Sequence, residues 1–148
     1  MAVLLANLAA TGVLIGLIWT VQVVHYPLFS AVGPAAWPTY AAAHARRITI
    51  LVLPYMLLEL GTSLLLLWVH PAALPLPSVW LGVALVAAVW ISTVAWQGPL
   101  FAKLAARWDP AVHRALVLSN WARTALWTAR GSLALWMLWK VSSSNPLP

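Results

Sequence analysis

The residues of this chain that could do chemistry gather in a stretch near the C-terminus, which begins at His113 and reads HRALVLSNWARTALWTAR. Its polar and aromatic residues recur at spacings of three, four and three: Asn120, Arg123, Trp127 and Arg130. On a helix this spacing places them on one stripe, and His113 falls on the same stripe. Two arginines on one face of an apolar helix need partners, so the stripe predicts polar groups on the helices around it.

The composition predicts that these helices lie in a membrane. The chain has 148 residues, of which 64% are hydrophobic and only 7% are charged, whereas a soluble domain carries about 25% charged residues. We expect one integral membrane domain over residues 1–148, with the lipid bilayer as its partner. The absence of cysteine excludes disulfides, thiolate metal sites and a cysteine nucleophile. The net charge of +6 comes from basic residues at or inside apolar segments, which favours membrane topology and buried pairing over nucleic-acid binding.

Four apolar segments separated by proline-containing breaks predict the fold class, an all-α, four-helix transmembrane bundle with up-down-up-down topology. The expected helices cover residues 2–26, 39–69, 78–106 and 110–141. Pro27 is expected to end or bend the first helix, because the residue before a proline disfavours helix. Asp109 is expected to cap the fourth helix, with Pro110 at its first position.

The basic residues predict an orientation. Five of them fall at the end of the bundle that bears the first and third loops: Arg46, Arg47, Lys103, Arg107 and Arg114. Only Lys140 clearly lies at the other end. The positive-inside rule then puts the first and third loops in the cytoplasm and both termini on the non-cytoplasmic side.

A weak internal repeat favours a duplicated helix pair. The tripeptide PLF occurs at positions 27–29 and again at 99–101, near the end of the first and third expected helices. A break containing tryptophan and proline follows each copy, and then comes a helix with a polar residue three positions before an arginine. These pairs are His44 with Arg47 and Asn120 with Arg123. True duplication would relate the two pairs by an axis along the membrane normal; chance resemblance is the alternative, because the match needs an insertion of about one helical turn.

Glu59 is the only acidic residue inside an apolar segment. Counted from Ile48, where the second helix is expected to enter the membrane core, Glu59 lies about 11 residues deep, or roughly 16 Å. Arg130 reaches a similar depth on the fourth helix. An unpaired charge near the bilayer midplane costs about 2.5–3.5 kcal/mol, so we expect Glu59 and Arg130 to form a buried ion pair, either as a structural lock or as a proton or ligand site.

The other polar residues predict one cavity that is wide toward the cytoplasm and closed near Glu59 and Arg130. Each expected helix carries one polar stripe, and the natural arrangement turns all four stripes inward. On the first helix the stripe consists of Asn7, Thr11, Gln22 and His25. The candidate ligand-binding residues are Gln22, His25, Tyr26, Tyr40, His44, Arg47, Gln97, His113, Asn120, Arg123 and Trp127.

The sequence leaves three alternatives for what this cavity contains. Three histidines at one level are compatible with haem or a metal, and His25 and His44 are then the best candidate ligands. No Glu-x-x-His or His-x-x-x-His pattern supports such a site. Arginines beside tyrosines and tryptophans instead suit a quinone-like or anionic headgroup. A purely structural polar core is the third alternative.

The HYPLF…W…Y…H…R spacing of the first half and the NWxRTxxWTxR run of the second resemble small bacterial four-helix integral membrane proteins of unknown function. This resemblance implies a multi-pass protein of a bacterial-type inner membrane. In size and layout the chain is also loosely similar to the anthrone-oxygenase-like membrane families. Their signature is not found in this sequence, so no residue role is carried over from them.

Three functions are open at this level. The first is binding of a lipophilic or anionic small molecule in the cavity, as a binding protein or as a quinone-linked or cofactor-free oxidoreductase. The second is a small proton-coupled transporter with Glu59 and Arg130 as its gate. The third is a structural or assembly subunit, in a homo-oligomer or a larger membrane complex, without catalysis.

Overall fold

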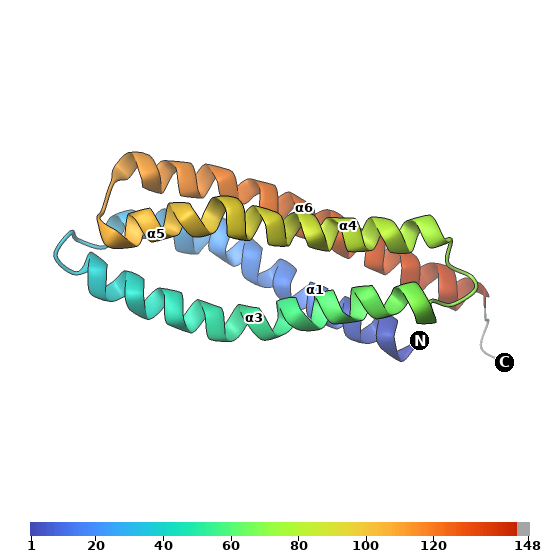
Figure 1. Ribbon diagram of the computed structural model, residues 1–148. Helices are drawn as coiled ribbons and strands as arrows, with labels where there is room; N and C mark the ends of the chain where they lie inside the picture. The colour runs from blue at the N-terminus through green and yellow to red at the C-terminus, as the bar shows by residue number, and fades with distance from the viewer. Residues whose placement is uncertain (145–148) are drawn as a thin grey trace.

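The computed structural model of the chain describes residues 1–144, and these residues are almost entirely helical (Figure 1). The elements in order are α1 (Ala2–Thr20), η1 (Val21–His25), α2 (Tyr26–Leu28), η2 (Phe29–Ala31), α3 (Trp37–Val69), α4 (Leu76–Ser92), η3 (Thr93–Gln97), α5 (Gly98–Ala106) and α6 (Pro110–Ser144). Two groups of elements are continuous, so the chain forms four long helical segments: Ala2–Ala31, Trp37–Val69, Leu76–Ala106 and Pro110–Ser144. The all-helical prediction is confirmed for the described residues.

The four segments pack as a bundle in which each contacts two neighbours. α1 packs against α3 and α6, and α4 packs against the same two helices. The loops before α3 and before α6 lie at one end of the bundle, and the N-terminus lies at the other end with the loop before α4 (Figure 1). The packing order around the bundle is therefore α1, α3, α4 and α6, with α1 and α4 on opposite corners.

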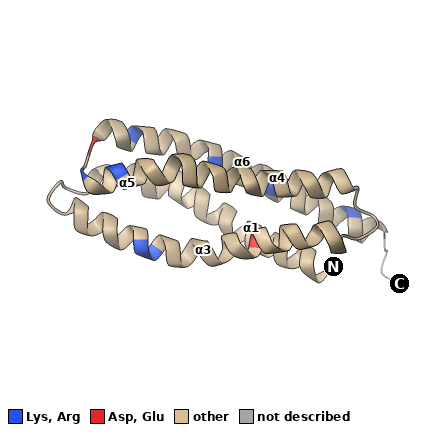
Figure 2. Ribbon diagram, in the orientation of Figure 1, with Lys and Arg blue, Asp and Glu red and all other residues tan. Residues whose placement is uncertain are grey.

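The distribution of side chains differs from that of a soluble protein, because polar side chains are buried among the apolar core and large apolar side chains are exposed. Ten polar or charged side chains are buried inside the bundle: Asn7, Thr11, Gln22, Glu59, Ser63, Gln97, Ser119, Asn120, Thr124 and Arg130. The outer faces of the helices instead expose large apolar residues such as Ile50, Ile91 and Val94, each at least 66% exposed. Figure 2 shows how sparse the charged residues are along the helices. Water disfavours such a surface and hydrocarbon suits it.

Three of the four segments are long and apolar enough to cross a membrane: Ala2–Ala31, Trp37–Val69 and Leu76–Ala106. The fourth, α6, has 35 residues but is less apolar. It carries Arg114, Arg123, Arg130 and Lys140 along its length. The polar residues in its middle face inward, because Ser119, Asn120, Thr124 and Arg130 are all buried.

Of the two effects expected of Pro27, an end or a bend of the first helix, the end is not found, because the helical path continues to Ala31. The turn before it widens to a π-helix, in which the Tyr26 N–H bonds the Val21 carbonyl five residues back. The wider turn makes room for the proline ring and absorbs the missing N–H donor. The helical path then continues to Ala31.

The same device recurs before the second PLF tripeptide. The π-helical turn η3 precedes Pro99, and the Gly98 N–H bonds the Thr93 carbonyl. A Cβ on Gly98 would lie 3.0 Å from that carbonyl oxygen, so glycine suits this close approach. Both copies of the tripeptide therefore share a local backbone geometry that the sequence comparison alone did not include.

Corresponding aromatic residues of the two halves meet at the loop end of the bundle. The ring centroids of Phe29 and Phe101 are 6.3 Å apart, and those of Trp37 and Trp108 are 4.8 Å apart. Phe29 and Trp37 are fully buried. The Trp37 indole N–H donates a hydrogen bond of 2.6 Å to the Leu104 carbonyl, which ties α3 to α5.

Candidate functional site

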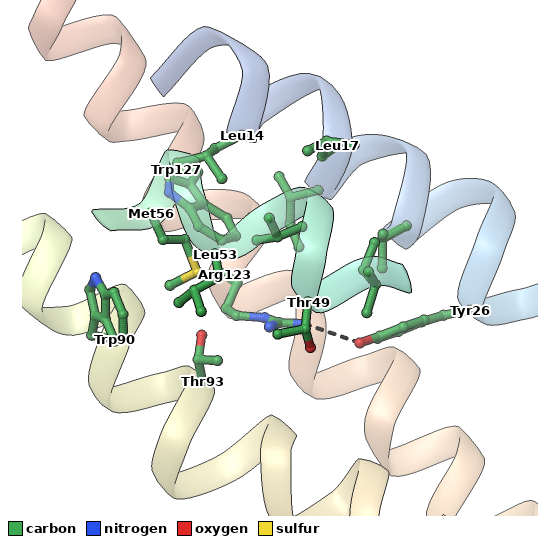
Figure 3. Close-up of a pocket in the computed structure, with 14 residues that line it drawn as sticks. Leu14, Leu17, Tyr26, Thr49, Leu53, Met56, Trp90, Thr93, Arg123 and Trp127 are labelled. Carbon is green, nitrogen blue, oxygen red and sulfur yellow. Dashed lines mark hydrogen bonds between the residues drawn. The ribbon is translucent and has the colours of Figure 1, made fainter. Parts of the chain in front are cut away.

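A cavity of about 240 Å³ lies between the four helical segments, near the middle of the bundle (Figure 3). Its apolar walls come from α1, η1, α3, α4 and α6 and are aliphatic and aromatic: Leu14, Leu17, Ile18, Val21, Ile48, Val52, Leu53, Met56, Trp90 and Trp127. Its polar lining consists of Tyr26, Thr49, Thr93 and Arg123. Thr49 and Leu53 are exposed, so the cavity opens past α3 to the apolar outside of the bundle. An apolar pocket with a few convergent polar groups is the usual form of a small-molecule site.

The guanidinium of Arg123 is held at this cavity by a chain of neutral partners. Arg123 Nε donates to Asn120 Oδ1 at 2.9 Å, and Nη2 donates both to the same oxygen and to the Tyr26 hydroxyl, at 3.3 Å in the latter case. The Asn120 amide donates to Gln22 Oε1 at 2.8 Å, and Gln22 donates to the Val117 carbonyl. Asn120 and Gln22 are buried, so Arg123 is positioned by a network that links η1 to α6.

A second cavity of about 200 Å³ lies on the loop side of Arg123. It shares Tyr26, Thr49, Thr93 and Arg123 with the first cavity, and its own lining includes His44 and Gln97. Both polar atoms of the Gln97 side chain are bonded. Its oxygen accepts a hydrogen bond from the Ser92 hydroxyl at 2.8 Å, and its nitrogen donates one to the Ser119 carbonyl at 3.0 Å. Arg123 and Tyr26 therefore stand at a junction between two spaces.

His25 and His44 face each other rather than a common metal position. His25 Nε2 and His44 Nδ1 are hydrogen-bonded at 3.0 Å, and the rings stack with centroids 4.8 Å apart. Together with Tyr40 and Arg47 they line a separate surface cavity of about 270 Å³. Among residues 1–144, no group of three or more histidine, aspartate or glutamate side chains is gathered as metal ligands would be. His25 and His44 remain the residues that could hold a metal or haem, but their rings would first have to rotate away from each other.

His113 lies outside all of these cavities. Its Nε2 bonds the Tyr26 carbonyl at 2.8 Å, so Nε2 carries the proton in this contact. Its ring packs beside Trp108 and Phe29, with centroids 5.0 and 6.4 Å away. His113 therefore links the start of α6 to α2 and lines none of the three cavities.

Glu59 and Arg130 share one buried polar cluster but do not contact each other directly in the described part of the chain. The Glu59 carboxylate accepts hydrogen bonds from the Thr11 hydroxyl at 2.7 Å and from the Trp127 indole N–H at 3.1 Å. Arg130 Nη2 donates to Asn7 Oδ1 and, at 3.3 Å, to Ser63 Oγ. The expected direct ion pair is not found in the described residues: both oxygens of the Glu59 carboxylate are bonded to Thr11 and Trp127, and only Nη2 of Arg130 is bonded, to Asn7 and Ser63.

Asn7 bonds both Arg130 and the backbone of Glu59, without contacting the Glu59 carboxylate. Its amide nitrogen donates to the Glu59 carbonyl at 3.2 Å, to Thr62 at 2.8 Å and to Ser63 at 3.0 Å, while its oxygen accepts from Arg130. Sequence reasoning placed Asn7 and Thr11 on a polar face but did not assign them to this cluster. The available signal was their spacing of four, which matches the spacing between Glu59 and Ser63.

Space for the guanidinium of Arg130 comes from a glycine on α4. A Cβ at Gly82 would lie 3.4 Å from Arg130 Cζ, so a larger side chain there would occupy the volume that the guanidinium fills. Arg130 is 1% exposed, and its Nε and Nη1 have no hydrogen-bond partner among the described residues. Of the three guanidinium nitrogens of Arg130, only Nη2 therefore has hydrogen-bond partners in this part of the chain.

The expected single wide cavity is divided in the structure. Tyr26, Arg123 and Trp127 line the central cavity, with Gln22 and Asn120 behind Arg123. His44 and Gln97 line the second cavity. His25, Tyr40 and Arg47 belong to the surface cavity with one face of His44. Sequence reasoning missed the apolar walls and the two threonines, Thr49 and Thr93, because it followed polar stripes only.

Comparison of the chain with protein-family models, with curated proteins and with solved structures finds no match. The resemblance to small bacterial membrane proteins stays a prediction.

Proposed function

We propose that this chain is a multi-pass membrane protein that binds a lipophilic small molecule between its helices. The observation that carries the proposal is the central cavity, whose apolar walls end at the polar pair Tyr26 and Arg123 and whose rim opens toward the apolar exterior. A molecule dissolved in the bilayer could enter there without passing through water. Binding is proposed here, and no chemical step is assigned to it.

The membrane part of the proposal includes α6 as a fourth spanning helix in an up-down-up-down bundle. Its length of 35 residues exceeds the roughly 20 residues that a membrane requires. Arg123 and Arg130 are compatible with this because they face the interior and bond polar groups of other helices. The end with the loops before α3 and α6 is placed in the cytoplasm, since Arg46, Arg47 and Arg107 are exposed there.

A duplicated helix pair is part of the same proposal. The two π-helical turns before Pro27 and Pro99, and the contacts of Phe29 with Phe101 and of Trp37 with Trp108, support it. Residues that meet their own counterparts lie close to a two-fold axis. The opposite positions of α1 and α4 fit an axis along the bundle, as parallel repeats would have.

The orientation can be tested by labelling single cysteines, because the chain has no cysteine of its own. Ala35→Cys places a thiol in the loop before α3, and Ala72→Cys places one in the loop before α4; both positions are exposed. A membrane-impermeant maleimide added to intact spheroplasts should label Ala72→Cys and should label Ala35→Cys only after permeabilisation. The opposite pattern would reverse the orientation, and labelling of both in intact cells would contradict an embedded bundle.

Binding can be tested by filling the cavity. Val52 lines the central cavity, and Val52→Trp should occupy much of its volume. Val94→Trp is the matched control, since Val94 is 68% exposed on the outer face. Native mass spectrometry of gently extracted protein should show a retained small molecule in the wild type and in Val94→Trp, and none in Val52→Trp. The retained mass would also identify a quinone.

A wild-type protein that is empty under these conditions, and that stays empty when lipophilic compounds are added, would overturn the binding proposal. A structural or assembly subunit would then be the better account. Stoichiometric retention that Val52→Trp does not change would also contradict the proposal, because the bound molecule would then lie outside the central cavity.

A further inference from the structure

We infer that the molecule in the central cavity is an amphiphile with one apolar tail and one anionic headgroup, which it places on Arg123. This inference rests on the proposed binding function and adds the chemical class of the ligand. Three observations carry it: the charges of the chain, the hydrogen bonds around Arg123 and the shape of the cavity.

Neither acidic side chain of the protein serves as a counter-ion to Arg123. The chain has two acidic residues, Glu59 and Asp109. The Glu59 carboxylate is bonded to Thr11 and Trp127 in the cluster that contains Arg130. Asp109 is exposed and caps α6, where it accepts from the backbone N–H groups of residues 111 and 112 at 2.7 and 3.3 Å. Arg123 is thus left with a full positive charge inside a largely apolar bundle.

The partners that Arg123 does have are neutral and leave donors free. Nε and Nη2 bond the Asn120 oxygen and the Tyr26 hydroxyl. Within residues 1–144, no acceptor is bonded to Nη1. The Tyr26 oxygen accepts from Arg123, so its own proton remains available for donation. Both residues line the cavity, which therefore presents a cation and a hydroxyl donor side by side to one occupant (Figure 3). An anion satisfies both, whereas a neutral carbonyl leaves the charge uncompensated.

The rest of the cavity suits a single tail. Away from Arg123 the walls are aliphatic and aromatic, and Trp127 and Met56 close the deep end. The cavity volume of about 240 Å³ is smaller than the roughly 300 Å³ at which pockets for drug-sized ligands begin. It is too small for both tails of a diacyl lipid. The second cavity, on the loop side of Arg123, leaves room for a headgroup of carboxylate or phosphate size.

The experiment compares ligands that share one tail and differ in headgroup. Decanoate, decyl phosphate and decanol are titrated into the full-length protein in nanodiscs, and affinity is taken from the fraction bound in native mass spectrometry. Decanoate or decyl phosphate should bind about tenfold more tightly than decanol, because a charge-assisted hydrogen bond replaces a neutral one. The stronger of the two anions identifies the headgroup chemistry as carboxylate or phosphate.

Three variants keep the test specific. Arg123→Gln should remove the preference for the anion and retain decanol binding, and Arg123→Lys should keep most of the preference. Arg46→Gln is the matched control, since Arg46 is an exposed arginine that lines none of the described cavities, and it should bind all three compounds as the wild type does.

The outcomes separate the two proposals. Equal binding of decanol and both anions to the wild type would overturn the anionic headgroup while leaving the lipophilic site in place. An anion preference that survives Arg123→Gln would also overturn it. Binding of none of the three compounds, or binding that Val52→Trp leaves unchanged, would overturn the proposed function itself.

Discussion

Replacing Glu59 with glutamine should lower the free energy of unfolding by about 3–5 kcal/mol. Within residues 1–144, the substitution removes the only negative charge near Arg130, which is 1% exposed and has two nitrogens without partners there. It also turns one acceptor of the carboxylate into a donor, which faces the Thr11 hydroxyl or the Trp127 indole N–H. Unfolding in sodium dodecyl sulfate, followed by circular dichroism, measures the loss.

Two further variants show whether the loss comes from the buried charge. Asp109→Asn makes the same chemical change at an exposed helix cap, where asparagine is as good as aspartate, and should leave stability nearly unchanged. Glu59→Gln combined with Arg130→Met should cost less than the sum of the two single losses, because the double variant leaves neither charge unmatched. Additive losses would contradict an energetic coupling between the two buried charges.

Phe29→Ala should cost about 3–5 kcal/mol, the range for deleting a fully buried large aromatic side chain. Phe29 is 0% exposed and stands at the centre of the aromatic cluster at the loop end of the bundle. Its ring lies within 5.5 Å of those of His25, Tyr26, Trp37 and His44. The cavity left by alanine would lie between η2, α3 and α5. Thermal unfolding in detergent measures the effect.

The second PLF tripeptide supplies the control for this variant. Phe101 occupies the corresponding position but is only half-buried. Phe101→Ala should therefore destabilise the protein clearly less than Phe29→Ala. Equal losses would mean that the two halves contribute alike to this cluster, contrary to the burial seen here.

The apolar segments and their breaks predicted the helices well because hydrophobic length and proline placement are local signals. Pro27 was the exception, since its effect on the backbone depends on a π-helical turn that a residue pattern does not reveal. The burial of Asn7, Thr11 and Gln22 also followed from their shared stripe on the first segment. For α6, the stripe of Asn120 and Arg130 correctly marked the interior face.

The candidate site was less predictable for a physical reason. Opposite charges were expected to pair directly, but neutral side chains with short reach, Thr11 and Ser63, compete for the same bonding positions when helices pack closely. Cavities are also defined by what does not fill space, and Thr49, Val52 and Thr93 carry no pattern of their own in the sequence. Only the packed structure shows that they surround a void beside Arg123.

Trp127 links the buried polar cluster of Glu59 and Arg130 to the central cavity. Its indole N–H donates to Glu59 Oε2, while its ring forms part of the wall of the central cavity. The side chain is 2% exposed, so it has little freedom to change its orientation. The cluster around Glu59 therefore holds the deep end of the cavity in shape, and Arg123 with its neutral partners holds the other end.

The most direct measurement is the distance between a ligand headgroup and Arg123. Rotational-echo double-resonance NMR, on ¹⁵N-arginine-labelled protein in bilayers with decanoate labelled with ¹³C at its carboxyl carbon, reports this distance. The proposed site predicts a carboxyl carbon within roughly 4 Å of a guanidinium nitrogen, as in a charge-assisted contact, and loss of this signal in Arg123→Gln. A signal that persists in Arg123→Gln, or is absent from the wild type with decanoate bound, would contradict an anionic ligand held by Arg123 inside the bundle.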